Sequence, residues 1–307
     1  MNKGVLAILL GLVLAIGFAM SAADRAEALT LYVPENGFVV PYVVADTTTG
    51  LDTAIGVTVI PQATAPIWLK WTFFNECSVH IMDDEICVTP GDFEPLFWSQ
   101  MMGSGLDGVR GYLVFNDAST DDSWVTANAF LIKGLDIAAF IPILPLSFDD
   151  IAYTGSKDIC PLPTSFQLAD VVTAEYGIQA GDNVLLRYAI DGLESRIICW
   201  FVDNPGFVKP PLTPLTVDIY DSYENNVSVS IDLPCEISII NPATDILGRP
   251  NSFVDGFIHI GSTADVWPFD GIAFTLVANG DPLDLSPLPS EIQTLMAVHY
   301  YWAGPLF

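Results

Sequence analysis

Short runs of β-branched and aromatic residues recur along the chain, and Gly, Pro, Asn or Asp bound each of them. This pattern is typical of short strands joined by tight turns. The 23 Gly and 22 Pro are spread along the chain, as a protein with many turns requires. Helical periodicity is weak, and only Ser290–Ala297 is expected to form one or two helical turns. The sequence therefore predicts an all-β, antiparallel fold. The clearest predicted strands are Val39–Val44, Ala54–Ile60, Ile67–Phe74, Gly111–Asn116, Val184–Ile190, Arg196–Val202, Leu215–Tyr220 and Phe257–Ile260.

A faint internal repeat suggests that the fold is duplicated. Similar residues recur in the same order about 146 positions apart: Tyr42 and Tyr188, Phe74 and Tyr220, Asn75 and Asp221, Gly111-Tyr112-Leu113 and Gly256-Phe257-Ile258, Phe130 and Phe274, Cys87 and Cys235. We therefore expect two tandem antiparallel β-sandwich domains of immunoglobulin-like or jelly-roll type, each with seven or eight strands. The predicted domains cover residues 29–150 and 165–307, with a linker at 151–164.

The N-terminus is typical of an export signal. A lysine at position 3 precedes the uncharged apolar run Val5–Met20, and small residues follow it. Cleavage is expected after Ala23 or, preferably, after Ala28, so that residues 1–28 form a signal peptide. The run is shorter than the roughly 20 residues of a membrane-spanning helix, and we expect no transmembrane helix in the mature chain. The predicted location is the periplasm, the cell surface or the extracellular space.

All five cysteines follow the predicted signal peptide, where an oxidising compartment would favour disulfides. Cys77 and Cys87 flank the acidic segment Asp83-Asp84-Glu85, which we interpret as a turn, and these two cysteines are expected to pair across a hairpin. Cys199 is expected to pair with Cys235. Cys160 then stays free, or bridges to one of the others across the domain boundary.

The charge balance excludes some partners. The chain has 37 acidic and 10 basic residues, and such a surface repels nucleic acid and anionic lipid. Clustered acids could instead hold calcium, which needs six to eight oxygen ligands. The best candidate site is Asp117 with Asp121 and Asp122, because Asn and hydroxyl side chains lie beside them. No other cofactor is expected.

Catalytic signatures are scarce in the sequence. The three histidines are His80, His259 and His299, and no G-x-S-x-G motif accompanies them. Carboxylate pairs are too numerous among so many acids to single out a glycosidase. Trp98, Trp124 and Trp267 are candidate sugar-stacking residues, although core packing explains them equally well. We therefore predict that the protein is not an enzyme.

Three segments resemble a loose group of uncharacterised exported all-β proteins of environmental bacteria. They are Trp71–Cys77 (WTFFNEC), Ile86–Phe93 (ICVTPGDF) and Val109–Val114 (VRGYLV). The second half of the chain departs from this pattern, with Asp255-Gly256-Phe257 in place of Arg110-Gly111-Tyr112. The resemblance implies export and β architecture, and it brings no known activity.

The expected function is that of a structural, adhesive or assembly component of the cell envelope or extracellular space. The apolar fraction, 51%, exceeds what two small cores need, and the segment Ala138–Leu144 could bury its surplus against a second copy or an envelope partner. The alternative is a calcium-dependent glycan-binding module. A third class is an outer-membrane-associated protein, suggested by the aromatic C-terminus at Val298–Phe307, or a glycan hydrolase.

Overall fold

The structure is a computed structural model, and it describes residues 35–60, 66–117, 124–133, 137–146, 177–178, 182–201, 214–261, 271–283 and 292–300. Within these ranges the chain forms strands and one four-residue helix, α2 (Trp98–Met101). The predicted all-β, antiparallel fold class is confirmed. We call residues 35–146 the first half and residues 177–300 the second half.

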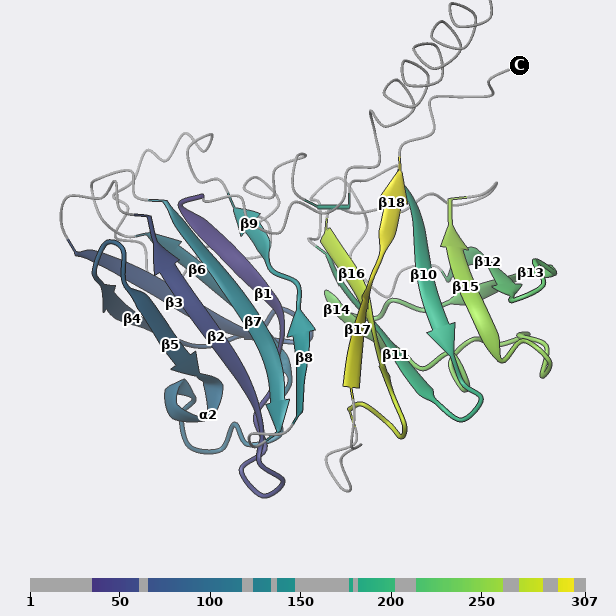
Figure 1. The fold of residues 1–307 in the computed structure, drawn as a ribbon, viewed down its shortest axis with the longest axis horizontal. Coiled ribbons are helices and arrows are strands. Elements are labelled where there is room, and N and C mark those ends of the chain that lie inside the picture. Colours follow the sequence, from purple (N-terminus) through teal and green to yellow (C-terminus); the bar gives the residue numbers. More distant parts are fainter. Residues whose placement is uncertain are drawn as a thin grey trace, which may run out of the picture.

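The first half forms two antiparallel sheets (Figure 1). Sheet A has the strand order β5-β2-β7-β8, and sheet B has the order β4-β3-β6-β1-β9. Their strands are β1 (Gly37–Val43), β2 (Leu51–Val59), β3 (Ile67–Asn75), β4 (His80–Val88), β5 (Phe93–Phe97), β6 (Gly111–Asp117), β7 (Val125–Lys133), β8 (Ile137–Ile141) and β9 (Leu144–Leu146).

The second half repeats this arrangement strand for strand. Sheet C has the order β14-β11-β16-β17 and sheet D the order β13-β12-β15-β10-β18, so each strand number exceeds that of its counterpart in sheet A or B by nine. Sheet C therefore corresponds to sheet A, and sheet D to sheet B. The strands are β10 (Asn183–Ala189), β11 (Glu194–Phe201), β12 (Leu215–Asp221), β13 (Asn226–Ile231), β14 (Ile237–Ile240), β15 (Asp255–Ile260), β16 (Gly271–Ala278), β17 (Ile292–Met296) and β18 (Val298–Tyr300).

A stacked aromatic pair recurs at the same place in sheets B and D. Phe74 on β3 lies opposite Tyr112 on β6, with ring centroids 5.1 Å apart and an interplanar angle of 15°. Tyr220 on β12 lies opposite Phe257 on β15, with centroids 4.7 Å apart and an angle of 13°. Directly opposed side chains are the stabilising units of a sheet, so the two halves share register as well as strand order.

Steric crowding explains why a glycine precedes Tyr112 and Phe257, the second residue of each aromatic pair. A Cβ atom on Gly111 would collide with the carbonyl oxygen of Phe74, and one on Gly256 would collide with that of Tyr220. The two backbones approach each other closely only because these positions lack a side chain.

The turn that follows the aromatic pair is also repeated. The side-chain oxygen of Asn75 accepts the backbone N–H groups of the residues two and four positions later, and so does that of Asp221. The residue three positions later has a left-handed φ, 56° at Ser78 and 65° at Glu224. Asn and Asp favour such turns because their side chains satisfy the backbone locally.

Three of the matches predicted from the sequence do not hold. Phe130 pairs with Ala54, one residue after Thr53, whereas Phe274 pairs with Ile198, three residues after Ser195, the counterpart of Thr53. Cys87 lies on β4, whereas Cys235 lies between β13 and β14, so the two cysteines are not equivalent. A bulge in β1 places Val43, rather than Tyr42, at the position that Tyr188 occupies on β10. An inserted residue of this kind shifts every later side chain by one place.

Each of the eight strand segments predicted from the sequence overlaps an observed strand, but two local predictions are wrong. Ile292–Met296, within the predicted helical segment, forms strand β17 on the edge of sheet C. Asp83-Asp84-Glu85 lies within strand β4 on the edge of sheet B rather than in a turn. Charged residues protect an exposed sheet edge from pairing with another chain, which accounts for acids at this position.

The first half buries its core between sheets A and B. Trp98 of α2 is fully buried there, 4.4 Å from the ring of Phe73 and 6.1 Å from that of Trp71 on β3. A second apolar cluster lies between sheets C and D and includes Cys199 of β11 and Ile219 of β12.

Candidate functional site: the junction of the halves and the outer sheet faces

The outer face of sheet C packs against the first half. Ile198, Trp200, Ile272, Phe274 and Leu276 are at most 1% exposed and belong to the same apolar cluster as the core of the first half. Their neighbours along β11 and β16 point the other way, into the second cluster. Sheet C is therefore apolar on both faces, as expected for a sheet covered on both sides.

The surface that sheet C covers is the outer face of sheet B. The ring of Trp200 on β11 meets that of Tyr112 on β6 edge to face, with centroids 5.6 Å apart. Tyr112 stacks on Phe74, and both rings are buried. An edge-to-face contact of this kind adds about 0.5–1.5 kcal/mol to the burial of the rings.

A disulfide joins the two halves beside this contact. Cys77, in the turn after β3, bonds to Cys235, just before β14, with their Cα atoms 4.6 Å apart. The backbone N–H of Ile237 donates to the carbonyl oxygen of Glu76 at 2.9 Å. The turn of sheet B and the start of sheet C's edge strand are thus held together covalently and through the backbone.

The expected cysteine pairs, Cys77–Cys87 and Cys199–Cys235, are not those of the structure. Cys77 and Cys87 stand at opposite ends of β4, and nine residues of strand span about 30 Å. Cys199 faces the interior between sheets C and D and keeps a free thiol, and Cys87 is free and exposed. Cys160 lies outside the described residues.

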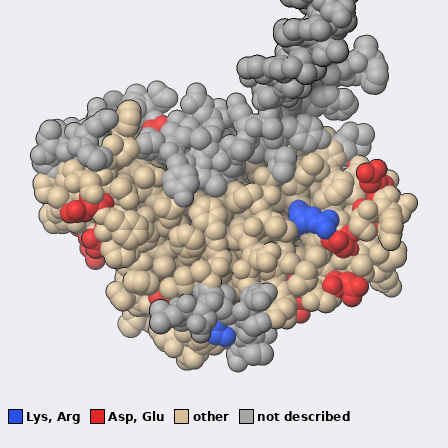
Figure 2. Space-filling model, in the orientation of Figure 1, with Lys and Arg blue, Asp and Glu red and all other residues tan. Residues whose placement is uncertain are grey.

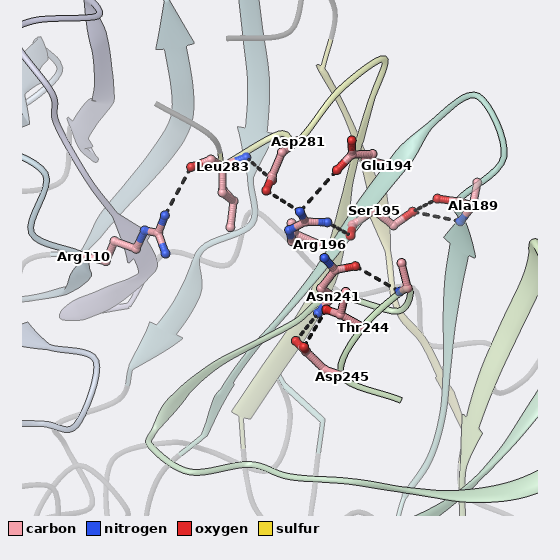
Figure 3. A network of polar contacts seen from close by, with 11 residues as sticks. Arg110, Ala189, Glu194, Ser195, Arg196, Asn241, Thr244, Asp245, Asp281 and Leu283 are labelled. Carbon is pink, nitrogen blue, oxygen red and sulfur yellow. Dashed lines mark hydrogen bonds and ion pairs between the residues drawn. The ribbon is translucent and has the colours of Figure 1, made fainter. Parts of the chain in front are cut away.

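Polar groups also link the halves (Figure 3). Arg110, just before β6, donates to the carbonyl oxygen of Leu283 at 3.2 Å, and the N–H of Leu283 donates to Asp281 at 2.9 Å. Asp281 in turn forms an ion pair with Arg196 of β11, whose side chain is only 10% exposed and lies 3.3 Å from Glu194. The ion pair lies within the second half and holds the segment of Asp281 and Leu283 in place, so that the carbonyl of Leu283 can accept the hydrogen bond from Arg110 of the first half.

Two tyrosines at the junction stay neutral. Burial raises the pKa of Tyr42 and of Tyr112 well above the ordinary value of 10. The hydroxyl of Tyr112 lies 2.6 Å from that of Ser78, so its polar end is satisfied. These phenols therefore add no titrating charge to the junction at physiological pH.

The outer face of sheet D, in contrast, carries a row of polar side chains. The Ser228 hydroxyl donates to Asp218 at 2.6 Å, Asp218 lies opposite His259, and Nε2 of His259 is 3.2 Å from the side-chain oxygen of Asn183. Burial lowers the pKa of His259, and the nearby Asp218 opposes this effect. The serine hydroxyl bonds to the carboxylate and not to the imidazole, so the row lacks the nucleophile–base contact of a hydrolytic site.

The corresponding positions of sheet B are uncharged. Thr72 and Val114 occupy in sheet B the places of Asp218 and His259 in sheet D, and both are fully buried. At this place the covered face of sheet B has an uncharged pair, whereas sheet D has a carboxylate that is 9% exposed and a partly buried imidazole.

The predicted calcium ligands are only partly described. Asp117 is buried at the end of β6, and its N–H donates to the carbonyl oxygen of Asn36 at 2.8 Å. Asp121 and Asp122 lie outside the described residues. Among the residues that the structure describes, no group of three or more His, Cys, Asp or Glu could hold a metal ion.

The other residues singled out from the sequence are dispersed. His80 pairs with Asp83 at 2.9 Å on the exposed edge of sheet B. Trp98 is a core residue and Trp124 is 47% exposed, while Trp267 and the side chain of His299 are not described. The described part of the chain contains no helix that is long and apolar enough to cross a bilayer.

Comparison with family models, with curated proteins and with solved structures finds no match to this chain.

Proposed function

We propose that this protein is an exported, non-enzymatic structural or assembly component of the cell envelope or the extracellular space. The proposal is that its two halves are tandem β-sandwich domains, formed by duplication and fused into one rigid block. The observation that carries it is the junction, where an apolar face of sheet C, a disulfide and the hydrogen bond from Arg110 to Leu283 all join the halves.

The repeated strand order supports duplication of a sandwich. Two unrelated sheet pairs would not be expected to share a nine-strand order, a stacked pair at Phe74 and Tyr220, and a turn built on Asn75 and Asp221. Each pair encloses apolar side chains between its two sheets, which is the defining feature of a β-sandwich.

The junction supports a rigid rather than a hinged block. Contacts between domains of one chain are commonly polar and permit relative motion. Here Trp200 and Phe274, at most 1% exposed, lie in the cluster that also holds the first core, and moving the halves apart would expose them to water. Fully exposing one such side chain costs about 1.5–3 kcal/mol.

The disulfide supports export. Cys77 and Cys235 are 158 residues apart in the sequence, and such a bond persists in an oxidising compartment. The apolar run Val5–Met20 and the small residues after it have the pattern of an export signal, which agrees with this location.

Expression of the whole chain in a bacterial host, followed by fractionation, tests the proposal. We expect the envelope or the medium to contain a chain that begins at Leu29, or at Asp24 if cleavage follows Ala23, with Cys77 and Cys235 oxidised. The matched control is Leu10→Arg, which places a charge in the apolar run and should leave an uncleaved chain with reduced thiols in the cytosol. An unmodified chain that stays uncleaved in the cytosol with both thiols reduced would contradict the proposal.

A further inference from the structure

Two of the four outer sheet faces cover each other. Sheets B and C meet at the junction, whereas among the described residues no other sheet covers the outer face of sheet A or of sheet D. We propose that the protein assembles head to tail, with the outer face of sheet D of one copy docked on the outer face of sheet A of the next copy. This contact would repeat the contact of sheet B with sheet C, and the proposal rests on the assembly function proposed above.

The partner is inferred from the correspondence of the sheets. Sheet A matches sheet C, and the face of sheet C is covered by a sheet of type B. Sheets B and D are equivalent, and within the described chain the outer face of sheet D is not covered by another sheet. The surface that fits sheet A is therefore sheet D of another copy.

Two hydroxyl contacts fix the alignment of sheet A with sheet C. The Thr53 hydroxyl bonds to both the N–H and the carbonyl of Val44, and the Ser195 hydroxyl bonds in the same way to Ala189. Both residues lie near the start of equivalent strands, β2 and β11. Five positions further on, Thr58 therefore matches Trp200.

This alignment identifies the edge-strand residue that would take part. Thr58 pairs with Phe93 on β5, and Trp200 pairs with Ile237 on β14. Phe93 thus occupies in sheet A the position of Ile237, the residue that bonds to the Cys77 turn at the junction. Its side chain is 61% exposed.

The turn of sheet D offers a matching residue. Because the Asn75 and Asp221 turns are equivalent, Tyr223 stands where Cys77 stands in the first half. Tyr223 is 85% exposed, the highest value among the large apolar side chains of the described residues. Tyr223 and Phe93 are therefore exposed at the positions equivalent to Cys77 and Ile237. At the junction, the segments of those two residues are joined by the disulfide and by a backbone hydrogen bond.

Sheet D also has an aromatic pair equivalent to the one at the junction, but no tryptophan of the described chain caps it in the way that Trp200 caps Tyr112. At the junction the edge of the Phe74–Tyr112 pair is capped by Trp200. The equivalent pair, Tyr220 with Phe257, is only partly buried.

The outer face of sheet A is unusually free of charge for this chain. The outward positions of its four strands include one carboxylate, that of Asp52, which accepts hydrogen bonds from Ser99. The ring of Phe93 lies over Gly56 on this face, and Phe130 is 38% exposed. In the view of Figure 2, acidic side chains gather at the two sides of the molecule, and most of the described surface between them is uncharged apart from a patch of Lys and Arg. Copies with a net charge of −27 repel each other, so a face without carboxylates is where they approach most easily.

The contact between copies would be weaker than the junction within one chain, and it would allow further copies to add. Docking sheet D requires the partly buried imidazole of His259 to lose its remaining water, a cost that Val114 avoids at the junction. Assembly is therefore expected to be reversible and to depend on concentration. A contact between two different faces leaves one of each open, so copies continue to add until a ring closes or a filament forms.

Sedimentation velocity and electron microscopy of the purified chain test the proposal. We expect species larger than a monomer that grow with protein concentration, and that grow further at about 1 M salt, where charge repulsion is screened. Phe93→Glu should block the sheet A face and Tyr223→Glu the sheet D face, so each variant alone should sediment as a monomer. The matched control is Trp68→Glu, because Trp68 is a 51% exposed aromatic on sheet B, and this variant should assemble like the unmodified chain.

Mixing the two blocked variants gives the sharpest result. Each retains one working face, so the mixture should form dimers of one Phe93→Glu and one Tyr223→Glu chain that grow no further. Variants that are monomeric both alone and mixed would overturn the head-to-tail contact, and so would variants that assemble like the unmodified chain, while assembly itself would stand. An unmodified chain that is monomeric at every concentration and salt level would overturn both this inference and the assembly function.

Discussion

Removing the disulfide between the halves should lower the stability of the whole chain. The perturbation is the double substitution Cys77→Ser with Cys235→Ser. The bond joins residues 158 positions apart, so in the unfolded chain it closes a long loop. The loop-entropy relation gives a stabilisation of about 5 kcal/mol for a loop of this length. This value is an upper bound, because residual contacts in the unfolded chain reduce it.

Guanidinium unfolding followed by tryptophan fluorescence measures the effect. With a slope of about 5 kcal/mol per molar denaturant, a loss of 5 kcal/mol moves the midpoint down by about 1 M. The control is Cys87→Ser, which removes an exposed free thiol and should leave the midpoint unchanged. The contact between Trp200 and Tyr112 involves no sulfur, so the double variant should still unfold in a single transition.

Two results would refute this reasoning. A double variant with the same midpoint as the Cys87→Ser control would mean that the bond does not hold the halves together in the way the structure has it. Two separate transitions in the double variant would mean that the disulfide, rather than the apolar junction, makes the halves behave as one body.

Three further substitutions or reactions test other parts of the structure. Trp200→Ala should cost about 3–5 kcal/mol in unfolding free energy because it leaves a cavity at the junction, whereas Trp68→Ala, at an exposed site, should change it by less than about 0.5 kcal/mol. Gly256→Ala should cost about 1–3 kcal/mol, since its Cβ would collide with a carbonyl of the neighbouring strand, and thermal unfolding would measure the loss. Burial raises the pKa of Cys199 to about 12, so at pH 8 its thiol stays protonated and should resist maleimide in the folded chain, while exposed Cys87 reacts. Peptide mapping before and after unfolding checks this contrast.

The strands that the sequence revealed are those with a buried face or a high β propensity. Ile67–Phe74 and Leu215–Tyr220 were predicted because β-branched and aromatic residues fill them and turn residues bound them. Strand β4 was hidden because Asp83-Asp84-Glu85 has the composition of a turn, and an exposed edge strand needs no apolar alternation. Strand β17 was hidden because Gln, Leu and Met favour helices locally, and only pairing with β16 overrides that preference.

The junction was harder to predict, although one signal pointed to it. The run Ile197–Phe201 is apolar without alternation, which indicates a strand buried on both faces and so a sheet covered on its outer side. The run does not indicate which part of the chain covers the sheet. The disulfide could not be predicted without that information, because Cys77 and Cys235 approach each other only after the halves have packed. Sequence distance alone favours pairs of nearer cysteines.

Differences between equivalent positions carry more information about assembly than the repeat itself. The two halves share one backbone order, so differences in side-chain polarity reflect what lies over each face. Thr72 and Val114, which the second half covers, are uncharged, whereas their counterparts in sheet D are Asp218, which is 9% exposed, and the partly buried His259. The outer face of sheet A departs from the rule, because Phe93 and its neighbours are open to water in a strongly acidic chain and yet carry almost no charge. A face that is uncharged, and that no other sheet of the described chain covers, is explained if its cover comes from another copy. Among the described residues, the equivalent contact is the one that sheet B makes with sheet C.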